Sequence, residues 1–373
     1  MKKSRVLFAS LAALSLFATA CSSDDDDGGK AVSDTSTSTA ASAGTETTAG
    51  STETTAGATE TTAGSDATVA PTTGASTVET VDATAGQDIT IAVITHGDDG
   101  VFWSVAQKGA EQAGDDLGIT VNYQGANNDG AAEAGFIDQA VADGVDGIAV
   151  SLADPDALEA SVKAAVAAGI PVVTLNSGSD LFKDLGAITH VGQDETVAGN
   201  GAGEKMTELG ATKILCVKQE QTNVGLEARC NGADDTFDGE VVQITTSGDA
   251  DPVASQSEIN AALAADEDID AIFATGPVGA HLAVLAAEEL GRDVIIGAVD
   301  LSTDILADIS SGAAAFTIDQ QQYLQGYLAV VFLYLNVTNA NTVGGGLPVY
   351  TGPGFVTADN VDAVAALVEA GTR

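Results

Sequence analysis

The chain has 373 residues, of which 54 are acidic and 13 are basic, so its formal net charge is −41. This excess of carboxylates argues against nucleic acid and phosphate-rich molecules as partners, because both would be repelled. A well-solvated acidic surface is the simplest explanation of the charge.

The first residues read as an export signal. A basic start at residues 2–5 precedes an apolar run over residues 6–19, which is too short to span a bilayer and ends in small residues. The segment Ala18-Thr19-Ala20-Cys21 resembles a lipobox, the cleavage and lipidation site of bacterial lipoproteins. We therefore predict a signal peptide over residues 1–21 with a lipid on Cys21. An ordinary secretory signal with a chance cysteine is the alternative.

Residues 22–86 cannot bury a core. They consist mainly of Ser, Thr, Ala, Gly and Asp, with almost no large apolar side chain. The unit Thr-Glu-Thr-Thr-Ala-Gly occurs at residues 45–50, 52–57 and 59–64. A seven-residue spacing is typical of coiled coils, but no position of this repeat carries a large hydrophobe. We expect a disordered tether between a membrane and a folded head.

From Gln87 onwards, short apolar runs alternate with longer amphipathic stretches. The strands expected in a first series are Ile89–Thr95, Thr120–Gln124, Gly147–Ser151 and Pro171–Leu175, with helices at Val101–Leu117, Ala131–Asp143 and Pro155–Ala168. The strands expected in a second series are Lys213–Lys218, Glu240–Thr245, Ala271–Thr275 and Val294–Val299, with helices around Arg229 and at Ser255–Ala264 and Gly279–Leu290. Continuous apolar strands that alternate with helices predict a parallel sheet covered on both faces. The two series thus predict an α/β fold with two doubly wound lobes.

Ligands of open α/β sheets bind beyond the carboxyl ends of the strands. In this chain the segments at those ends are polar and include two aromatic residues; they are His96–Trp103, Ser151–Asp154, Asn176–Asp180, Gln219–Asn223, Gly276–Gly279, Asp300–Thr303 and Asp319–Gln322. Carboxylates, amides and a guanidinium group can bind hydroxyls, and aromatic rings can stack on the apolar faces of a sugar ring.

Several segments carry a resemblance to a known family. They are Asp88–Gly97, Val101–Ala110, Asp138–Asp154, Ala168–Asn176, Gly297–Asp300, Phe316–Gln321 and Thr351–Phe355. In their order and spacing, residues 89–373 resemble type I periplasmic binding proteins of the ribose-binding kind. The resemblance implies two lobes joined by three crossings near Gln193–Glu195, Ile318–Gln320 and Pro348–Thr351. It assigns residues 87–193 and 320–348 to the first lobe, and residues 194–319 and 349–373 to the second.

The resemblance also implies a role for individual residues. Phe102 and Trp103 stand at the stacking positions, and Asn176, Arg229, Asp300 and Gln320 stand at positions that hydrogen-bond the sugar. His96 and Ser151 complete the expected ligand-binding set. Ser177 and Gly276 depart from the arginine and asparagine of ribose binders, which puts ribose itself in doubt. Because Phe102 and Trp103 are adjacent, we expect at least one of the two rings to pack rather than stack.

The expected function is therefore an extracytoplasmic, lipid-anchored binding protein that captures a small sugar or polyol by hinge closure and delivers it to the permease of an ABC importer. A receptor that presents a furanosyl autoinducer to a sensor or chemoreceptor is the alternative. We expect a monomer that attaches to the membrane only through its lipid, and no cofactor, metal, nucleic-acid partner or catalysis. Cys216 and Cys230 are a candidate disulfide pair in an oxidising compartment, with two buried thiols as the alternative.

Two motifs are set aside. Gly199-Asn-Gly-Ala-Gly203 resembles a dinucleotide-binding loop, but its third glycine comes one position early and the family places a packed helix there. Asp249-Ala-Asp251 resembles the start of a calcium loop that lacks its central glycine. His190 and His281 belong to no ligating cluster and are expected to be structural.

Overall fold

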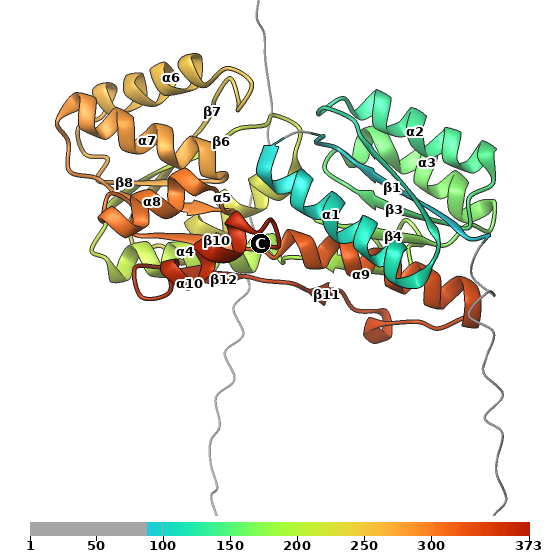
Figure 1. Cartoon of the computed structure of the whole chain (residues 1–373). Helices are drawn as coiled ribbons and strands as arrows, with labels where there is room; N and C mark the ends of the chain where they lie inside the picture. Colours follow the sequence, from blue (N-terminus) through green and yellow to red (C-terminus); the bar gives the residue numbers. More distant parts are fainter. Residues whose placement is uncertain (1–87, 99) are drawn as a thin grey trace, which may run out of the picture. The chain divides into compact units, whose positions relative to one another are not determined.

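The computed structural model describes residues 88–98 and 100–373 (Figure 1). The predicted signal peptide, Cys21 and the tether lie outside these residues. Across the part described, every helix is too short or too polar to cross a membrane.

The first lobe contains a sheet of six strands in the order β11-β5-β4-β3-β1-β2. Its strands are β1 (Thr90–Thr95), β2 (Thr120–Gly125), β3 (Gly147–Ser151), β4 (Val172–Leu175), β5 (Thr189–Gly192) and β11 (Val349–Tyr350). Its helices are α1 (Gly100–Leu117), α2 (Gly130–Asp143), α3 (Pro155–Ala167) and α9 (Gln322–Asn339). Helices α2 and α3 pack on one face of the sheet, and α1 and α9 pack on the other. All pairings in this sheet are parallel, as the apolar strands predict.

The second lobe repeats this plan with the order β12-β10-β9-β8-β6-β7. Its strands are β6 (Lys213–Lys218), β7 (Glu240–Thr245), β8 (Ala271–Ala274), β9 (Ile295–Val299), β10 (Phe316–Asp319) and β12 (Gly354–Val356). Its helices are α4 (Glu195–Glu208), α5 (Val224–Thr236), α6 (Pro252–Ala265), α7 (Pro277–Leu290), α8 (Thr303–Ser311) and α10 (Val361–Glu369). Only β12 runs antiparallel, beside β10. The expected fold of two doubly wound lobes is confirmed.

Boundaries differ from the sequence prediction where turn chemistry decides them. Helix α6 begins at Pro252, three residues before the expected start, because Asp251 caps it and proline is favoured in a first turn.

The expected assignment of residue 349 onwards to the second lobe is wrong for Val349–Tyr350. These residues form β11, which pairs with β5 of the first sheet.

The chain passes between the lobes three times. The crossings are Gln193–Asp194 between β5 and α4, Gln320–Gln321 between β10 and α9, and Thr351–Pro353 between β11 and β12. The third crossing follows the expected position by a few residues because β11 extends the first sheet. All three crossings connect one lobe to the other, which is the geometry of a hinge.

Helices α4 and α5 of the second lobe pack closely against each other next to the first crossing. Gly199 of α4 faces the backbone of Arg229 on α5, and Gly232 of α5 faces the backbone of Thr196 on α4. A Cβ atom at either glycine would collide with the opposite backbone, so the two helices can approach only because both residues are glycines. The segment that resembled a dinucleotide loop is therefore a helix-packing surface.

Cys216 of β6 and Cys230 of α5 form a disulfide, with their Cα atoms 5.9 Å apart. Both residues are fully buried beside Phe273 and Phe316. The disulfide joins the helix that carries Arg229 directly to the sheet.

Candidate ligand-binding site

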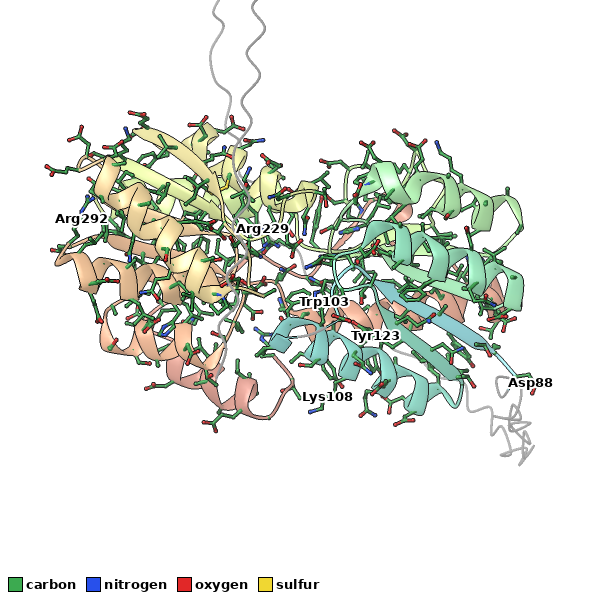
Figure 2. All side chains as sticks on the ribbon, turned by 90° about the horizontal axis from the view of Figure 1, so that it is seen from above. Asp88, Trp103, Lys108, Tyr123, Arg229 and Arg292 are labelled. Atoms are coloured by element: carbon green, nitrogen blue, oxygen red, sulfur yellow. A yellow bond between two sulfur atoms is a disulfide. The ribbon has the colours of Figure 1, made fainter. Side chains whose placement is uncertain are left out.

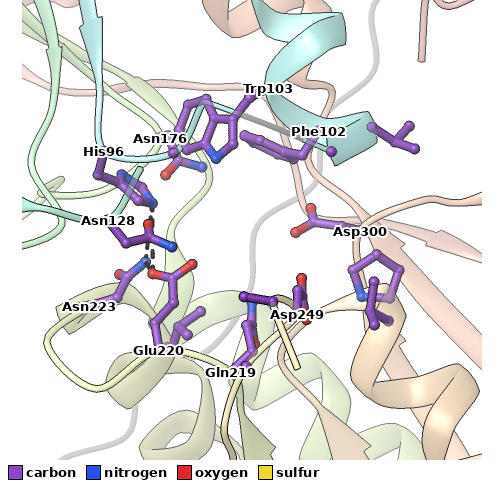
Figure 3. Close-up of a pocket in the computed structure, with 18 of the residues that line it drawn as sticks. His96, Phe102, Trp103, Asn128, Asn176, Gln219, Glu220, Asn223, Asp249 and Asp300 are labelled. Carbon is purple, nitrogen blue, oxygen red and sulfur yellow. Dashed lines mark hydrogen bonds and ion pairs between the residues drawn. The ribbon is translucent and has the colours of Figure 1, made fainter. Parts of the chain in front are cut away.

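A cavity of about 430 Å³ opens where the carboxyl ends of the strands of both lobes meet. Seven of the eight predicted ligand-binding residues line it: His96, Phe102, Trp103, Asn176, Arg229, Asp300 and Gln320. Figure 3 shows the two aromatic rings on one side of the cavity and Gln219, Glu220 and Asp249 on the opposite side. The view from above shows that Trp103 belongs to one lobe and Arg229 to the other (Figure 2).

Ser151, the eighth residue, does not line the cavity. It is fully buried behind His96, where its hydroxyl oxygen accepts a hydrogen bond of 2.7 Å from the His96 backbone N–H. The same oxygen lies 2.8 Å from His96 Nδ1, so Ser151 orients the imidazole ring. The structure thus places Ser151 behind the cavity wall, because the side chain of the last residue of β3 lies behind the end of the neighbouring strand.

Both aromatic rings line the cavity. That at least one of them packs rather than stacks on a ligand stays a prediction. Trp103 meets Phe102 edge to face, with ring centroids 4.8 Å apart, and meets His96 at 4.7 Å. Trp103 is buried, whereas Phe102 is half-buried. The two adjacent rings share one wall because they stand in the first turn of α1, whose N-terminus faces the cavity. Such a wall suits the C–H face of a sugar or cyclitol ring.

A chain of hydrogen bonds links the two lobes through the second crossing. The Asn176 amide donates to Gln320 Oε1 at 3.2 Å, and the Gln320 amide donates to Asp300 Oδ1 at 2.7 Å. Asn176 follows β4 in the first lobe and Asp300 follows β9 in the second. Gln320 therefore holds one polar group from each lobe at the floor of the cavity.

Arg229 and Asp300 are both buried, with Arg229 Nη1 3.9 Å from Asp300 Oδ2. Burial raises the pKa of Asp300 to about 7, against the opposing effects of Arg229 and Gln320. Burial alone would lower the pKa of Arg229, but Glu195, together with Asp300 and Glu220, outweighs burial and holds that pKa above its ordinary value. Burial also lowers the pKa of His96, which favours a neutral ring.

Sequence reasoning missed several residues of the site. Glu195, at the start of α4, binds the Arg229 guanidinium with two oxygens at 2.5 and 2.9 Å. Asn127 and Asn128 line the cavity from the loop after β2, and Ser247–Ala250 line it from the loop after β7. Each of these loops follows a strand, so the rule of carboxyl strand ends would have found them had it been applied to every strand.

Comparison with known proteins shows the family of the chain. Residues 91–340 match the family described as periplasmic binding protein domain. The chain belongs to this family. Among solved periplasmic binding proteins, a carbohydrate transporter of Acidothermus cellulolyticus in complex with myo-inositol is 44% identical. It covers 77% of this chain and 100% of its own, with a TM-score of 0.74.

Two further relatives share less of their sequence with the chain. A solute-binding protein of Burkholderia graminis in complex with D-arabinose is 26% identical with a TM-score of 0.67, and the match covers 74% of this chain and 97% of its own. A xylose/arabinose-binding protein of Sulfolobus acidocaldarius is 26% identical over 291 residues, which cover 73% of this chain and 71% of the relative.

Proposed function

We propose that this protein is exported, captures a small sugar or cyclic polyol in the cavity between its lobes, and delivers it to the permease of an ABC importer. The cavity carries the proposal, because it offers two aromatic rings from one lobe and an arginine–aspartate pair from the other. Relatives named for binding or importing sugars support import over a sensory role. The relative in complex with myo-inositol makes that polyol the first ligand to test.

Capture and hinge closure form one event in this proposal. A ligand that contacts Trp103 in the first lobe and Arg229 in the second stabilises the arrangement in which both are within reach. Because every crossing is only two or three residues long, the lobes can rotate about the crossings without unfolding a helix or strand.

The test is a thermal-shift screen against pentoses, hexoses, inositols and linear polyols. A ligand at about a hundred times its Kd adds about 2.7 kcal/mol to the stability of the folded state. Trp103 is the sole tryptophan, so its fluorescence should report binding, and small-angle scattering should report compaction with the same midpoint. A complete screen without any shift would contradict the proposal.

The membrane anchor is part of the same proposal. A lipid on Cys21, followed by the tether over residues 22–86, would hold a monomeric binding domain near the permease on the outer face of a membrane. In cells, Cys21→Ala should move the protein from the membrane fraction to the soluble extracytoplasmic fraction. Unchanged membrane association would remove the lipid from the proposal.

A further inference from the structure

The positive charge of Arg229 is already matched by an acid behind the cavity. Glu195 does not line the cavity, yet its Oε2 accepts from Arg229 Nε at 2.5 Å and its Oε1 accepts from Nη2 at 2.9 Å. The two side chains are only 4% and 6% exposed. A two-point pair of this kind fixes the plane of the guanidinium group as well as its position.

The backbone leaves Glu195 little freedom. Asp194 caps α4 directly before it, and the close approach of α4 to α5 sets the distance between Glu195 and Arg229. Gln193, in the first crossing, donates a further hydrogen bond of 2.9 Å to Glu195 Oε2. Arg229 Nη1 donates to the Thr275 backbone oxygen at 2.7 Å. The two bonds to Glu195 and the bond to Thr275 occupy three of the five N–H groups of the Arg229 guanidinium and leave two that can face a ligand.

The other ionisable side chains of Asp, Glu, Lys or Arg in the cavity wall are acidic. Among the described residues that line the cavity, Arg229 is the single lysine or arginine, whereas Glu220, Asp249 and Asp300 all carry carboxyl groups. With Glu195 opposite it, Arg229 presents directed N–H donors without an unmatched positive charge. Hydroxyl groups can use such donors. A ligand carboxylate would instead lie near the carboxyl groups of the wall, while Arg229, the one lysine or arginine among the described lining residues, is already paired with Glu195.

We propose that Glu195 selects uncharged polyols against sugar acids by neutralising and orienting Arg229, an inference that rests on the proposed function of the cavity. Glu195 acts through Arg229 and contacts no ligand itself. Its replacement should therefore change which ligands bind, and not merely how well the domain binds all of them.

The test compares neutral and acidic ligands on the full chain by isothermal titration. The neutral set is myo-inositol, D-glucose and D-galactose, and the acidic set is D-glucuronate and D-galacturonate. The variants are Glu195→Gln, which removes the charge and keeps one acceptor oxygen, and Glu204→Gln as the control, because Glu204 is exposed on the same helix. Unaltered protein and control should prefer the best neutral ligand at least a hundredfold over either uronate.

Glu195→Gln should shift this ratio toward the uronates by at least tenfold, or about 1.4 kcal/mol. Glu195→Asp retains the charge and should leave the ratio within about twofold, even if both affinities fall. Equal losses for both sets in Glu195→Gln would show that Glu195 is only structural and would overturn the inference, as would a tenfold shift in Glu195→Asp. Unaltered protein that binds a neutral polyol and its uronate equally would overturn the inference but leave the proposed function standing. Absence of binding to every sugar and polyol of the thermal-shift screen would instead refute the proposed function.

Discussion

Glu133 gives a prediction about stability that is independent of any ligand. It lies in the first turn of α2 and is 1% exposed. Its Oε1 lies 3.5 Å from the Ser151 hydroxyl, and its Oε2 has no hydrogen-bond partner among the residues that the structure describes. Burial raises the pKa of Glu133 from 4.5 to about 9, and the nearby Asp154 adds to the shift. The folded protein therefore holds a proton on Glu133 at neutral pH.

The sign of the pH effect follows from the raised pKa. Between the two values the folded chain keeps the proton and the unfolded chain loses it, so the contribution of Glu133 to stability is complete below about pH 4.5 and falls as pH rises toward 9. In this range the free energy of unfolding falls by about 1.36 kcal/mol for each pH unit, so the loss between pH 5 and pH 8 amounts to about 4 kcal/mol. Local opening that lets the carboxylate reach water would limit this loss, and we expect a change of about 2–4 kcal/mol.

Glu133→Gln removes this dependence because the amide stays neutral. The measurement is urea unfolding of the oxidised full chain at pH 5, 6, 7 and 8, with Glu288→Gln as the control because Glu288 is exposed. The stability of Glu133→Gln relative to the unaltered protein should rise by about 2–4 kcal/mol from pH 5 to pH 8. Comparing the two proteins at each pH cancels the pH-dependent charge repulsion that a net charge of −41 adds to both. A difference that stays constant across the range would refute a buried, protonated Glu133.

Three further predictions follow from other parts of the structure. Gln320→Ala removes the bridge between the lobes at the cavity floor and should weaken the identified ligand by about tenfold in titration, whereas His281→Ala, which loses only a bond to an aspartate of α8, should leave affinity unchanged. Reduction of Cys216–Cys230, whose sequence separation is 14, should lower the free energy of unfolding by about 3 kcal/mol; two titratable thiols in the unfolded, unreduced protein would show that no bridge forms. A chain that starts at Gln87 should bind the same ligand within about twofold, and a tenfold loss would show that the tether contributes to the site.

Hydrophobic patterning was sufficient to predict the fold class and four strands of each lobe, but not β5, β12, α4, α8, α9 or α10. The apolar runs at β3 and β6 have the predicted bounds because strands buried on both faces leave an unbroken signal in the sequence. The short β11 was missed because two residues at a sheet edge carry no such pattern. Glu195 was missed for a different reason. Its partner Arg229 lies 34 positions away, and their contact depends on glycine packing between two helices.

Backbone conformation explains why polar residues at the strand ends form so much of the site. Asn176 and Asp300 adopt left-handed conformations with φ values of 61° and 72°, and each backbone N–H still bonds to the neighbouring strand, at Val191 O and Ile318 O. Asparagine and aspartate tolerate this conformation better than most residues. The residue types that allow the chain to turn at the ends of β4 and β9 thus also bring an amide and a carboxyl group to the cavity floor. A replacement at either position must satisfy the turn as well as the ligand, so Asp300→Asn tests the charge alone, whereas Asp300→Ala would disturb both.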